Sequence, residues 1–335
     1  MTFLRLIAAT GVGLIVAAGA ASVGHAETYK IRVAHGASVK HPLHRYVEIY
    51  RDIVAKKTGG KVKIEIYGNR KLGGDKDVLL GVKAGTIDSG FVSSVLFALV
   101  VRKSSFDALQ LPFVVSKYDN LSKLLRSAPA NKMLASLDDI GIKGLGFGEA
   151  GQRHFLSSKG PVTTLAEFKG LKTRIVPVPL HKAVWQAVGA NPVGIAYGEV
   201  FTSMQTKVID AVEFNVSSVA AENLYENAKH LSLTGHYFWP LVLIHNKAKF
   251  DKLPKDIQAA MSAAAREATV LQVNYVRDNE KTTLESLKKK GVKVYKFKDL
   301  TTMRARMQPI IAKWIKRDPI IAEYVALARK LEAGK

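Results

Sequence analysis

The stretch Gly151–Asn215, GQRHFLSSKGPVTTLAEFKGLKTRIVPVPLHKAVWQAVGANPVGIAYGEVFTSMQTKVIDAVEFN, decides the fold of this chain. Arg153 begins a run that we predict to be a strand, and Arg174 heads a second strand after the turn glycine Gly170. Helical segments separate these strands, which indicates an α/β sheet whose ligands bind at strand ends. A guanidinium at such a place can hold a carboxylate with two parallel hydrogen bonds.

A single arginine on a strand is more often a surface charge or a structural ion pair than a ligand contact. The combined pattern carries more weight, and its motifs are Gly-x-Arg, Lys-Gly-Leu-Lys-x-Arg, Gly-Ala-Asn-Pro-Val, Glu-Val-Phe-x-x-Met-Gln-Thr and Ile-Asp-Ala-Val-Glu. In order and spacing they resemble the solute-binding proteins of TRAP (tripartite ATP-independent periplasmic) transporters, the DctP family. The resemblance covers nearly all of the mature chain. It implies an α/β, two-lobe periplasmic binding protein fold, type II-like, with a long helix spanning both lobes.

The N-terminus predicts export. Arg5 provides a short positive region, residues 6–21 are apolar and rich in Gly and Ala, and Gly24-His25-Ala26 has small residues at the outer positions before a cut. This pattern is typical of a secretory signal peptide, residues 1–26, cleaved after Ala26. An uncleaved membrane anchor is the alternative, but the apolar core is short for a bilayer span. We therefore expect a periplasmic protein, free of a lipid anchor because the chain has no cysteine to acylate.

The composition excludes some functions and leaves others open. The absence of cysteine excludes disulfides, cysteine metal sites and cysteine nucleophiles. The formal net charge is +22, and residues 281–317 alone contain twelve Lys or Arg and two Asp or Glu. A basic surface can attract nucleic acid, anionic lipid or acidic ligands. Because export argues against nucleic acid, we expect a solvated basic face with a weak preference for anions.

The loop after the first predicted strand, residues 35–42, contains two histidines. Such loops often face the ligand in α/β folds, and the resemblance implies the same use here, which makes His35 and His41 candidate pocket residues. For each, the alternative is a hydrogen bond to the backbone. No second cluster has the spacing of metal ligands, so we expect no metal and no cofactor.

Two more candidates lie in the N-terminal part. Asp75 follows a glycine pair in a loop that lies beside the ligand in the family, although its chemistry also suits the N-cap of the next helix, which we favour. Ser93 lies at the end of a predicted strand, where a hydroxyl can bond a ligand. By alignment with the family, Ser93 stands where sialic-acid-binding members carry a glutamate, which argues against a sialic acid ligand.

Four candidates lie in the C-terminal part. By alignment, Tyr197 occupies a position where an aromatic ring packs on the ligand, with core or rim packing as the alternative. Phe214 stands where many family members have asparagine, which suggests a more apolar ligand body, and Asn215 can supply the amide instead. Trp239 belongs to an aromatic cluster, residues 236–240, and either walls the pocket or packs in the core.

Residues 254–290 predict one long helix. After Pro254 the segment has no proline or glycine, and apolar residues recur at helical spacing up to Tyr275. About 35 residues would span about 50 Å, enough to cross two lobes. We expect lobe I to comprise residues 27–150 and about 240–275, and lobe II residues 151–239 and about 290–335.

The resemblance implies a function. Two lobes close over a small organic acid, with Arg174 as the main carboxylate clamp and Arg153 as support, and the closed form meets the small and large integral membrane subunits of a TRAP transporter. An exported sensory binding protein that signals to a membrane receptor is an alternative. A secreted hydrolase is less favoured because the chain lacks Gly-x-Ser-x-Gly and His-Glu-x-x-His motifs. The acid itself, and the choice between monomer and homodimer, stay open.

Overall fold

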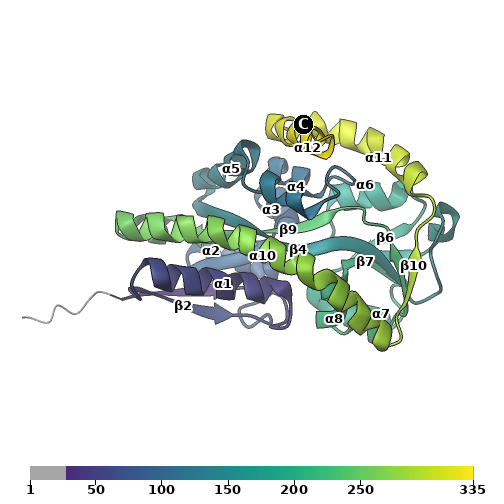
Figure 1. Cartoon of the computed structure of the whole chain (residues 1–335), viewed down its shortest axis with the longest axis horizontal. Coiled ribbons are helices and arrows are strands. Elements are labelled where there is room, and N and C mark those ends of the chain that lie inside the picture. The colour runs from purple at the N-terminus through teal and green to yellow at the C-terminus, as the bar shows by residue number, and fades with distance from the viewer. Residues whose placement is uncertain (1–27, 335) are drawn as a thin grey trace, which may run out of the picture.

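The computed structural model describes residues 28–334, which form one ten-stranded sheet with helices on both faces (Figure 1). The signal-peptide prediction therefore lies outside the described residues. The strands are β1 (Tyr29–Ala34), β2 (Val62–Tyr67), β3 (Ser89–Ser93), β4 (Ile142–Ser157), β5 (Lys172–Ile175), β6 (Asn191–Gly194), β7 (Ala211–Asn215), β8 (His230–Leu233), β9 (Phe238–Asn246) and β10 (Lys293–Lys296).

The helices connect and cover these strands. They are α1 (Pro42–Lys57), α2 (Asp75–Ala84), α3 (Val95–Val101), α4 (Tyr118–Leu124), α5 (Ala128–Ala135), α6 (Pro179–Ala187), α7 (Val200–Gln205), α8 (Val216–Ala221), α9 (Lys247–Asp251), α10 (Lys255–Lys289), α11 (Leu300–Ile315) and α12 (Pro319–Glu332), with 3₁₀ turns η1 (Ser104–Gln110), η2 (Asp138–Ile140), η3 (Leu165–Phe168), η4 (Tyr197–Glu199) and η5 (Leu224–Glu226).

The strand order β2-β1-β3-β9-β4-β7-β5-β6 divides the sheet into two halves. In the first half, β1 pairs in parallel with β2 and β3, and β3 pairs antiparallel with β9. In the second half, β5 pairs in parallel with β6 and β7, while β8 joins β4 and β10. The parallel strands are linked through helices, as the alternation of strand and helix signals predicts. The two-lobe α/β fold is thus confirmed.

Strands β4 and β9 run from one half of the sheet into the other. The predicted lobe boundary after residue 150 falls inside β4, which runs for 16 residues. Two irregularities in its pairing with β9, between Gly144 and Gly146 and between Glu149 and Gln152, bend the strand without ending it. Gly148 is needed for packing, because a Cβ there would lie 2.5 Å from the Phe91 ring.

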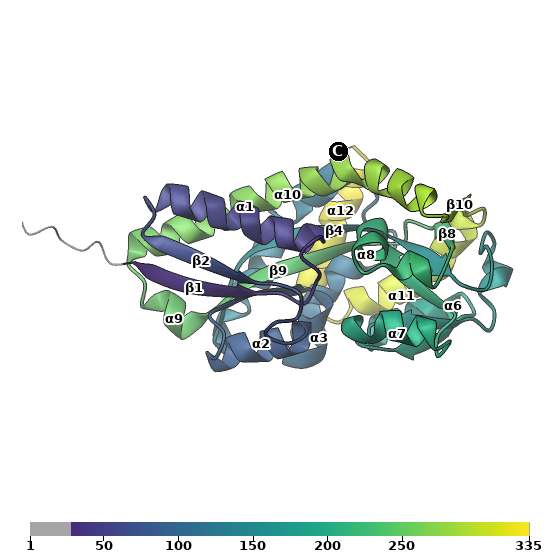
Figure 2. The same ribbon diagram turned by 90° about the horizontal axis from the view of Figure 1, so that it is seen from below.

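Helix α10 confirms the long helix predicted from the sequence. Its 35 residues correspond to about 52 Å, and it packs against α1, β4 and α8, hence against both halves of the sheet (Figure 2). Small buried residues, Ala264, Ala265 and Ala268, allow its backbone to approach the sheet closely. Figure 2 shows α1 and α10 on one side of β1, β2 and β9, and α2 and α3 on the other.

The local signals for helix ends are confirmed in part. Thr164 and Glu167 form the predicted capping interaction at η3, where the Glu167 carboxylate accepts the Thr164 N–H at 2.8 Å. The prediction that Asp75 caps α2 is wrong, because Asp75 is already the first helical residue and Gly74 is the N-cap. Asp77 supplies the carboxylate to the Gly74 N–H, at 2.9 Å. Asp75 is instead used to bind the end of β3.

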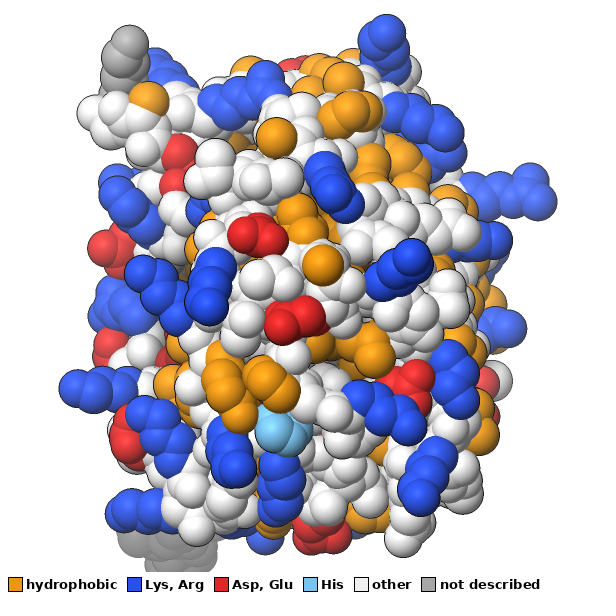
Figure 3. All heavy atoms as spheres, turned by 90° about the vertical axis from the view of Figure 1, so that its right-hand side faces the viewer, with side chains coloured by type: hydrophobic (Ala, Val, Ile, Leu, Met, Phe, Trp, Pro, Cys, Tyr) orange, Lys and Arg blue, Asp and Glu red, His pale blue; other side chains and the backbone are white. Residues whose placement is uncertain are grey.

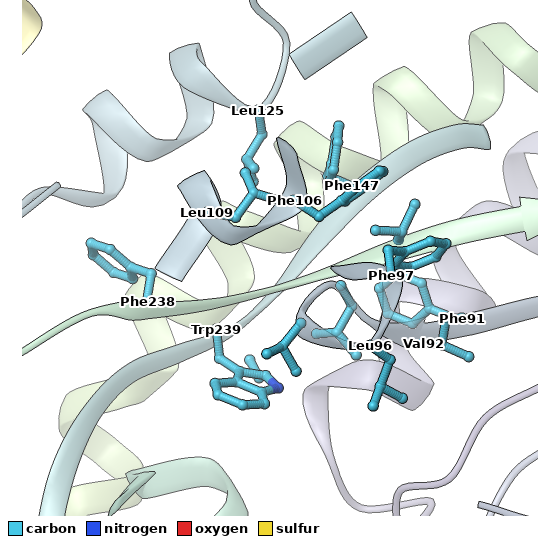
Figure 4. Close-up of a cluster of buried hydrophobic side chains, with 14 of the residues drawn as sticks. Phe91, Val92, Leu96, Phe97, Phe106, Leu109, Leu125, Phe147, Phe238 and Trp239 are labelled. Carbon is cyan, nitrogen blue, oxygen red and sulfur yellow. The ribbon is translucent and has the colours of Figure 1, made fainter. Parts of the chain in front are cut away.

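Aromatic side chains fill the core of the first half. The Tyr46 ring stacks on Phe91 with centroids 4.2 Å apart, and Phe97 stacks on Phe106 at 4.6 Å. Figure 4 shows Phe238 and Trp239, successive residues of β9, pointing to opposite sides of the sheet. This alternation of a strand places Phe238 in the core and leaves Trp239 for the other face.

No helix within residues 28–334 is both long and apolar enough to cross a membrane. Figure 3 shows Lys and Arg side chains spread over one end of the molecule, with Asp and Glu side chains interspersed among them.

Candidate functional site

A cavity of about 440 Å³ opens where the two halves of the sheet meet. Its walls come from the loops after β1 and β2, the ends of β3 and β5, helix α3, strands β4, β7 and β9, and the segment from Ile195 to Glu199. The carboxyl ends of parallel strands from both halves thus face one space, which is where α/β sheets bind ligands. The volume lies within the range of small-molecule sites, about 300–1,000 Å³.

Most of the residues predicted as ligand contacts line this cavity. They are Asp75, Ser93, Arg153, Arg174, Tyr197, Phe214 and Trp239, together with His41. They come from positions up to 198 residues apart in the chain (His41 to Trp239), and only the fold brings them together.

The Arg174 guanidinium is a buried cation of the wall that forms no ion pair within residues 28–334. The side chain is 1% exposed, and its Nε donates to the Ile195 carbonyl at 2.9 Å. Its Nη1 is buried and finds no acceptor within residues 28–334. Burial lowers the pKa of Arg174 to about 10, against the opposing attraction of Glu213, so the group stays protonated at neutral pH. A buried, unpaired donor of this kind calls for an anion.

Arg153, in contrast, is already paired. Its Nε donates to Glu213 Oε2 at 2.5 Å, and a second nitrogen donates to the Glu213 carbonyl. Burial opposes ionisation of Glu213, but the Arg153 charge and the His236 ring, whose Nε2 lies 3.5 Å from Glu213 Oε2, outweigh it and hold the Glu213 pKa at about 2. Tyr237 adds a hydrogen bond to the same carboxylate at 3.0 Å. The Arg153 charge is therefore neutralised by Glu213, and Arg153 lines the cavity as part of this ion pair.

Aromatic rings lie against both guanidinium groups. The Arg153 Cζ lies 3.8 Å from the Trp239 ring centroid and 4.7 Å from that of Phe214. The Phe214 ring also lies 5.1 Å from Arg174 Cζ. These cation–π contacts hold the two arginines in place, and they leave the rings as apolar wall.

The structure leaves two predicted residues outside the wall. His35 is fully buried, with its Nε2 3.0 Å from His44 Nδ1, and burial lowers its pKa to about 3. Asn215 donates to the Ala150 carbonyl and to Ser217, and its Oδ1 accepts from Ser218 at 2.7 Å. Both side chains thus support the wall from behind, because each strand presents only alternate residues to the cavity.

The sequence reasoning missed three residues at the cavity mouth. Arg70 lines the cavity from the loop after β2, and its Nη2 donates to Glu222 Oε2 at 2.8 Å. The other Glu222 oxygen accepts from the Ser38 N–H at 3.0 Å. Ser218 of α8 bonds His41 Nε2 at 2.9 Å. Arg70 follows a predicted strand, as His41 does, so the rule that strand ends face the ligand would have identified Arg70 as a candidate. Glu222 has no such signal in the sequence.

These contacts join the first half of the molecule to the second. On the side of the first half, Ser38 and His41 lie in the loop after β1, and Arg70 lies in the loop after β2. On the side of the second half, Ser218 lies in α8, which follows β7, and Glu222 is the residue after α8. We call the hydrogen bonds of Glu222 to Ser38 and Arg70 the mouth latch.

Among residues 28–334, no three His, Cys, Asp or Glu side chains gather as metal ligands.

Comparison with known proteins places this architecture. The family model "Bacterial extracellular solute-binding protein, family 7" matches residues 33–318. The 2,3-diketo-L-gulonate-binding periplasmic protein of Escherichia coli K12 is 31% identical over 291 residues, 87% of this chain and 88% of that protein.

Solved structures agree in fold over nearly the whole described chain. The sugar acid binding protein of Advenella mimigardefordensis in complex with galactonate superposes with a TM-score of 0.85, at 25% identity, over 91% of this chain and 99% of that one. A TRAP periplasmic solute-binding protein of Bordetella bronchispeptica, with density interpreted as pantoate, gives a TM-score of 0.83 at 29% identity, over 89% and 99% of the two chains.

Proposed function

The chain belongs to family 7 of the bacterial extracellular solute-binding proteins, and on that premise we propose that it captures a small organic carboxylate between its two lobes and delivers it to the membrane subunits of a TRAP transporter. The observation that carries the proposal is the buried Arg174 guanidinium, whose Nη1 has no acceptor within the described residues. The ligands named for the structural relatives, galactonate and pantoate, are both carboxylates and support this choice. The matched family is described as solute-binding, and we propose that this chain binds its ligand without converting it.

Arg174 acts as the clamp, and Arg153 positions it. A carboxylate at Arg174 receives charge-assisted hydrogen bonds in a water-poor cavity, where they are stronger than at the surface. The charge of Arg153 is paired with Glu213, and Arg153 helps to position Arg174 because both guanidinium groups pack on the Phe214 ring. Tyr197, Phe214, Trp239 and Ser93 line the remaining space.

The lobes divide at the crossing of β4 and β9. We assign β1, β2, β3 and the adjoining parts of β4 and β9 to lobe I, and β5, β6, β7, β8 and β10 to lobe II, with α10 spanning both. Residues 290–335 stand as lobe II in the sequence-based division. The packing of α12 against η1, α4 and α5 favours assigning that helix to lobe I instead.

Export to the periplasm and cleavage after Ala26 are part of the proposal, as is recognition of the closed form by the two TRAP membrane subunits. The choice between monomer and homodimer stays open, and light scattering of the purified protein measures it. Mass spectrometry of the N-terminus of the secreted protein tests the cleavage position.

The test is a thermal-shift screen of the mature protein against organic acids. A ligand that binds only the folded state raises the melting temperature by mass action. We expect one class of carboxylates to stabilise the wild type and the control Arg45→Ala, an exposed arginine paired only with Glu48 on α1, and to lose its effect in Arg174→Ala. If Arg174→Ala keeps the shift, the clamp is wrong, and if no acid shifts any of the proteins, the carboxylate function itself fails.

A further inference from the structure

Most polar side chains of the inner cavity wall form hydrogen bonds with other groups of the protein. His41 accepts from the Leu43 N–H through Nδ1 at 3.2 Å and bonds Ser218 through Nε2 at 2.9 Å. Ser218 in turn donates to Asn215 at 2.7 Å. Both ring nitrogens of His41 are therefore occupied, and this part of the wall offers few hydrogen bonds to a ligand.

Asp75 and Arg70 also make hydrogen bonds within the protein. Asp75 Oδ2 accepts the Ser93 N–H at 3.1 Å, and the Gly36 N–H also donates to this carboxylate. Arg70 spends its Nη2 on Glu222 and lies with its Cζ 5.3 Å from the Tyr197 ring centroid. The acidic group nearest Ser93 is thus a fixed part of the loop structure rather than a free ligand contact.

Two polar atoms of the wall residues are buried without a partner within residues 28–334, Arg174 Nη1 and Ser93 Oγ. Buried polar atoms are nearly always hydrogen-bonded in folded proteins, so an exception at a cavity marks the place where a ligand supplies the bond. A fitting ligand therefore carries one hydrogen-bond acceptor for Arg174 Nη1 and one further polar group for Ser93 Oγ.

The charges around the clamp point to a single negative charge. The two guanidinium groups of Arg153 and Arg174 face one carboxylate, Glu213. His181 and His236 lie in the same cluster and carry no charge at neutral pH, because burial lowers the pKa of each. One positive charge of this buried group is left without a counter-ion among the described residues, and one carboxylate neutralises it.

The inner part of the remaining wall is mainly apolar, and the further charged residues of the lining, Lys76, Asp77 and Glu199, are exposed. Trp239 and Phe214 present ring faces, and helix α3 contributes aliphatic side chains on the side of lobe I. The further apolar residues of the wall are Ala37, Leu43, Val95, Leu96, Leu99, Val176, Pro177, Ile195 and Leu241. In Figure 4 Trp239 and Leu96 lie on the same side of β9. The inner part of such a wall favours aliphatic or aromatic carbon and offers few partners to hydroxyl groups.

We propose that this site selects a monocarboxylate with an apolar aliphatic or aromatic body and one hydroxyl or keto group, the carboxylate at Arg174 and the second polar group at Ser93. This inference rests on the proposed function and narrows it. It separates the protein from a relative whose ligand is a polyhydroxylated acid, galactonate.

Two competing ligand classes fit the wall less well. A dicarboxylate would place its second charge beside the Asp75 carboxylate, which is bonded to the Ser93 N–H, and like charges at short range repel. A sugar acid would bring several hydroxyls against apolar side chains. Each hydroxyl that loses water without gaining a partner weakens binding by about tenfold.

The experiment compares affinities by calorimetry. The probes are 4-hydroxybenzoate, 4-hydroxyphenylacetate and ω-hydroxyalkanoates of increasing chain length, each beside its analogue without the hydroxyl, with galacturonate and succinate as the competing classes. We expect at least one hydroxylated monocarboxylate to bind at least tenfold tighter than galacturonate and succinate. Its advantage over the analogue without the hydroxyl should be about fivefold, the effect of one hydrogen bond.

Variants assign the two contacts. Ser93→Ala should remove the fivefold advantage of the hydroxyl and leave the affinity for the unsubstituted acid unchanged, whereas the control Ser136→Ala, whose Oγ bonds the Met133 carbonyl on α5, should change neither. Tighter binding of galacturonate or succinate than of every apolar monocarboxylate, still lost in Arg174→Ala, overturns this inference and leaves the proposed function standing. If no carboxylate binds, both fail.

Discussion

The mouth latch offers a test of closure that does not touch the clamp. Glu222 accepts the Ser38 N–H at 3.0 Å and an Arg70 Nη2–H at 2.8 Å. Ser38 and Arg70 belong to loops of lobe I and Glu222 follows α8 of lobe II, so both hydrogen bonds break when the lobes separate. Replacing Glu222 by alanine removes them from the closed form and takes nothing from the open one.

The structure sets the size of the effect. A hydrogen bond to a charged group contributes about 1.5–3 kcal/mol when buried. The Arg70 and Glu222 side chains are 29% and 14% exposed, so solvent screens the pair and reduces its contribution. We expect the two bonds together to stabilise the closed form by about 1–2 kcal/mol, which weakens ligand binding by about 5- to 30-fold when they are lost. Glu222→Gln keeps the bond to Ser38 and should lose about half of this free energy.

The assay is calorimetric titration of the preferred acid into the wild type, Glu222→Ala, Glu222→Gln and the control Glu226→Ala. Glu226 lies four residues further along in η5 and is exposed. Small-angle scattering with saturating ligand should give the same radius of gyration for all four proteins. The ligand-free melting temperature should change little, because the latch belongs to closure rather than to the core of either lobe.

A dissociation constant of Glu222→Ala within twofold of the wild-type value would refute the reasoning. The same holds if Glu226→Ala weakens binding as much as Glu222→Ala, since a general loss of negative charge would then explain both. A large fall in ligand-free melting temperature would assign Glu222 to folding instead of closure.

Three further predictions concern the clamp, the crossing and the core. Arg174→Lys should weaken binding of the preferred acid about 10- to 100-fold in calorimetry, because an ammonium cannot give two parallel hydrogen bonds; an unchanged affinity would mean that the carboxylate meets only a point charge. Burial raises the pKa of Glu149 to about 8, with backbone N–H donors opposing, so the folded state binds this proton more tightly than the unfolded one and stability falls as the pH rises from about 4.5 to 8. Glu149→Gln should remove that loss, and melting of both proteins at pH 5 and pH 8 measures it, with equal slopes contradicting the assignment. Phe97→Ala, at a side chain with no exposed surface, should reduce the free energy of unfolding by about 3–5 kcal/mol in urea titration; a loss below about 1 kcal/mol would contradict its place in the core.

Local patterns predicted the elements of the fold well. The alternation of residues 30–34 gave β1, the heptad-like stripe from Ile257 gave α10, and Thr164 with Glu167 gave the cap of η3. Each of these signals acts between residues a few positions apart, and the chain obeys it wherever tertiary contacts do not compete. Local patterns did not show that one strand, β4, runs through the predicted lobe boundary after residue 150, because pairing with β9 over long sequence separation holds the strand through its bulges.

Sequence by itself determined the family, the two-lobe architecture and the positions of the arginines on strands. Only the tertiary structure decided which arginine is free. Arg153 and Arg174 look alike in the sequence, but Glu213 lies 60 residues from Arg153 in the chain and bonds it at 2.5 Å, while Arg174 Nη1 finds no acceptor within the described residues. In the same way Asn215 and His35 turned out to support the wall, and Glu222 joined the mouth. Charge pairing inside a protein depends on side chains brought together by folding over long sequence separations, and no local pattern records those distances.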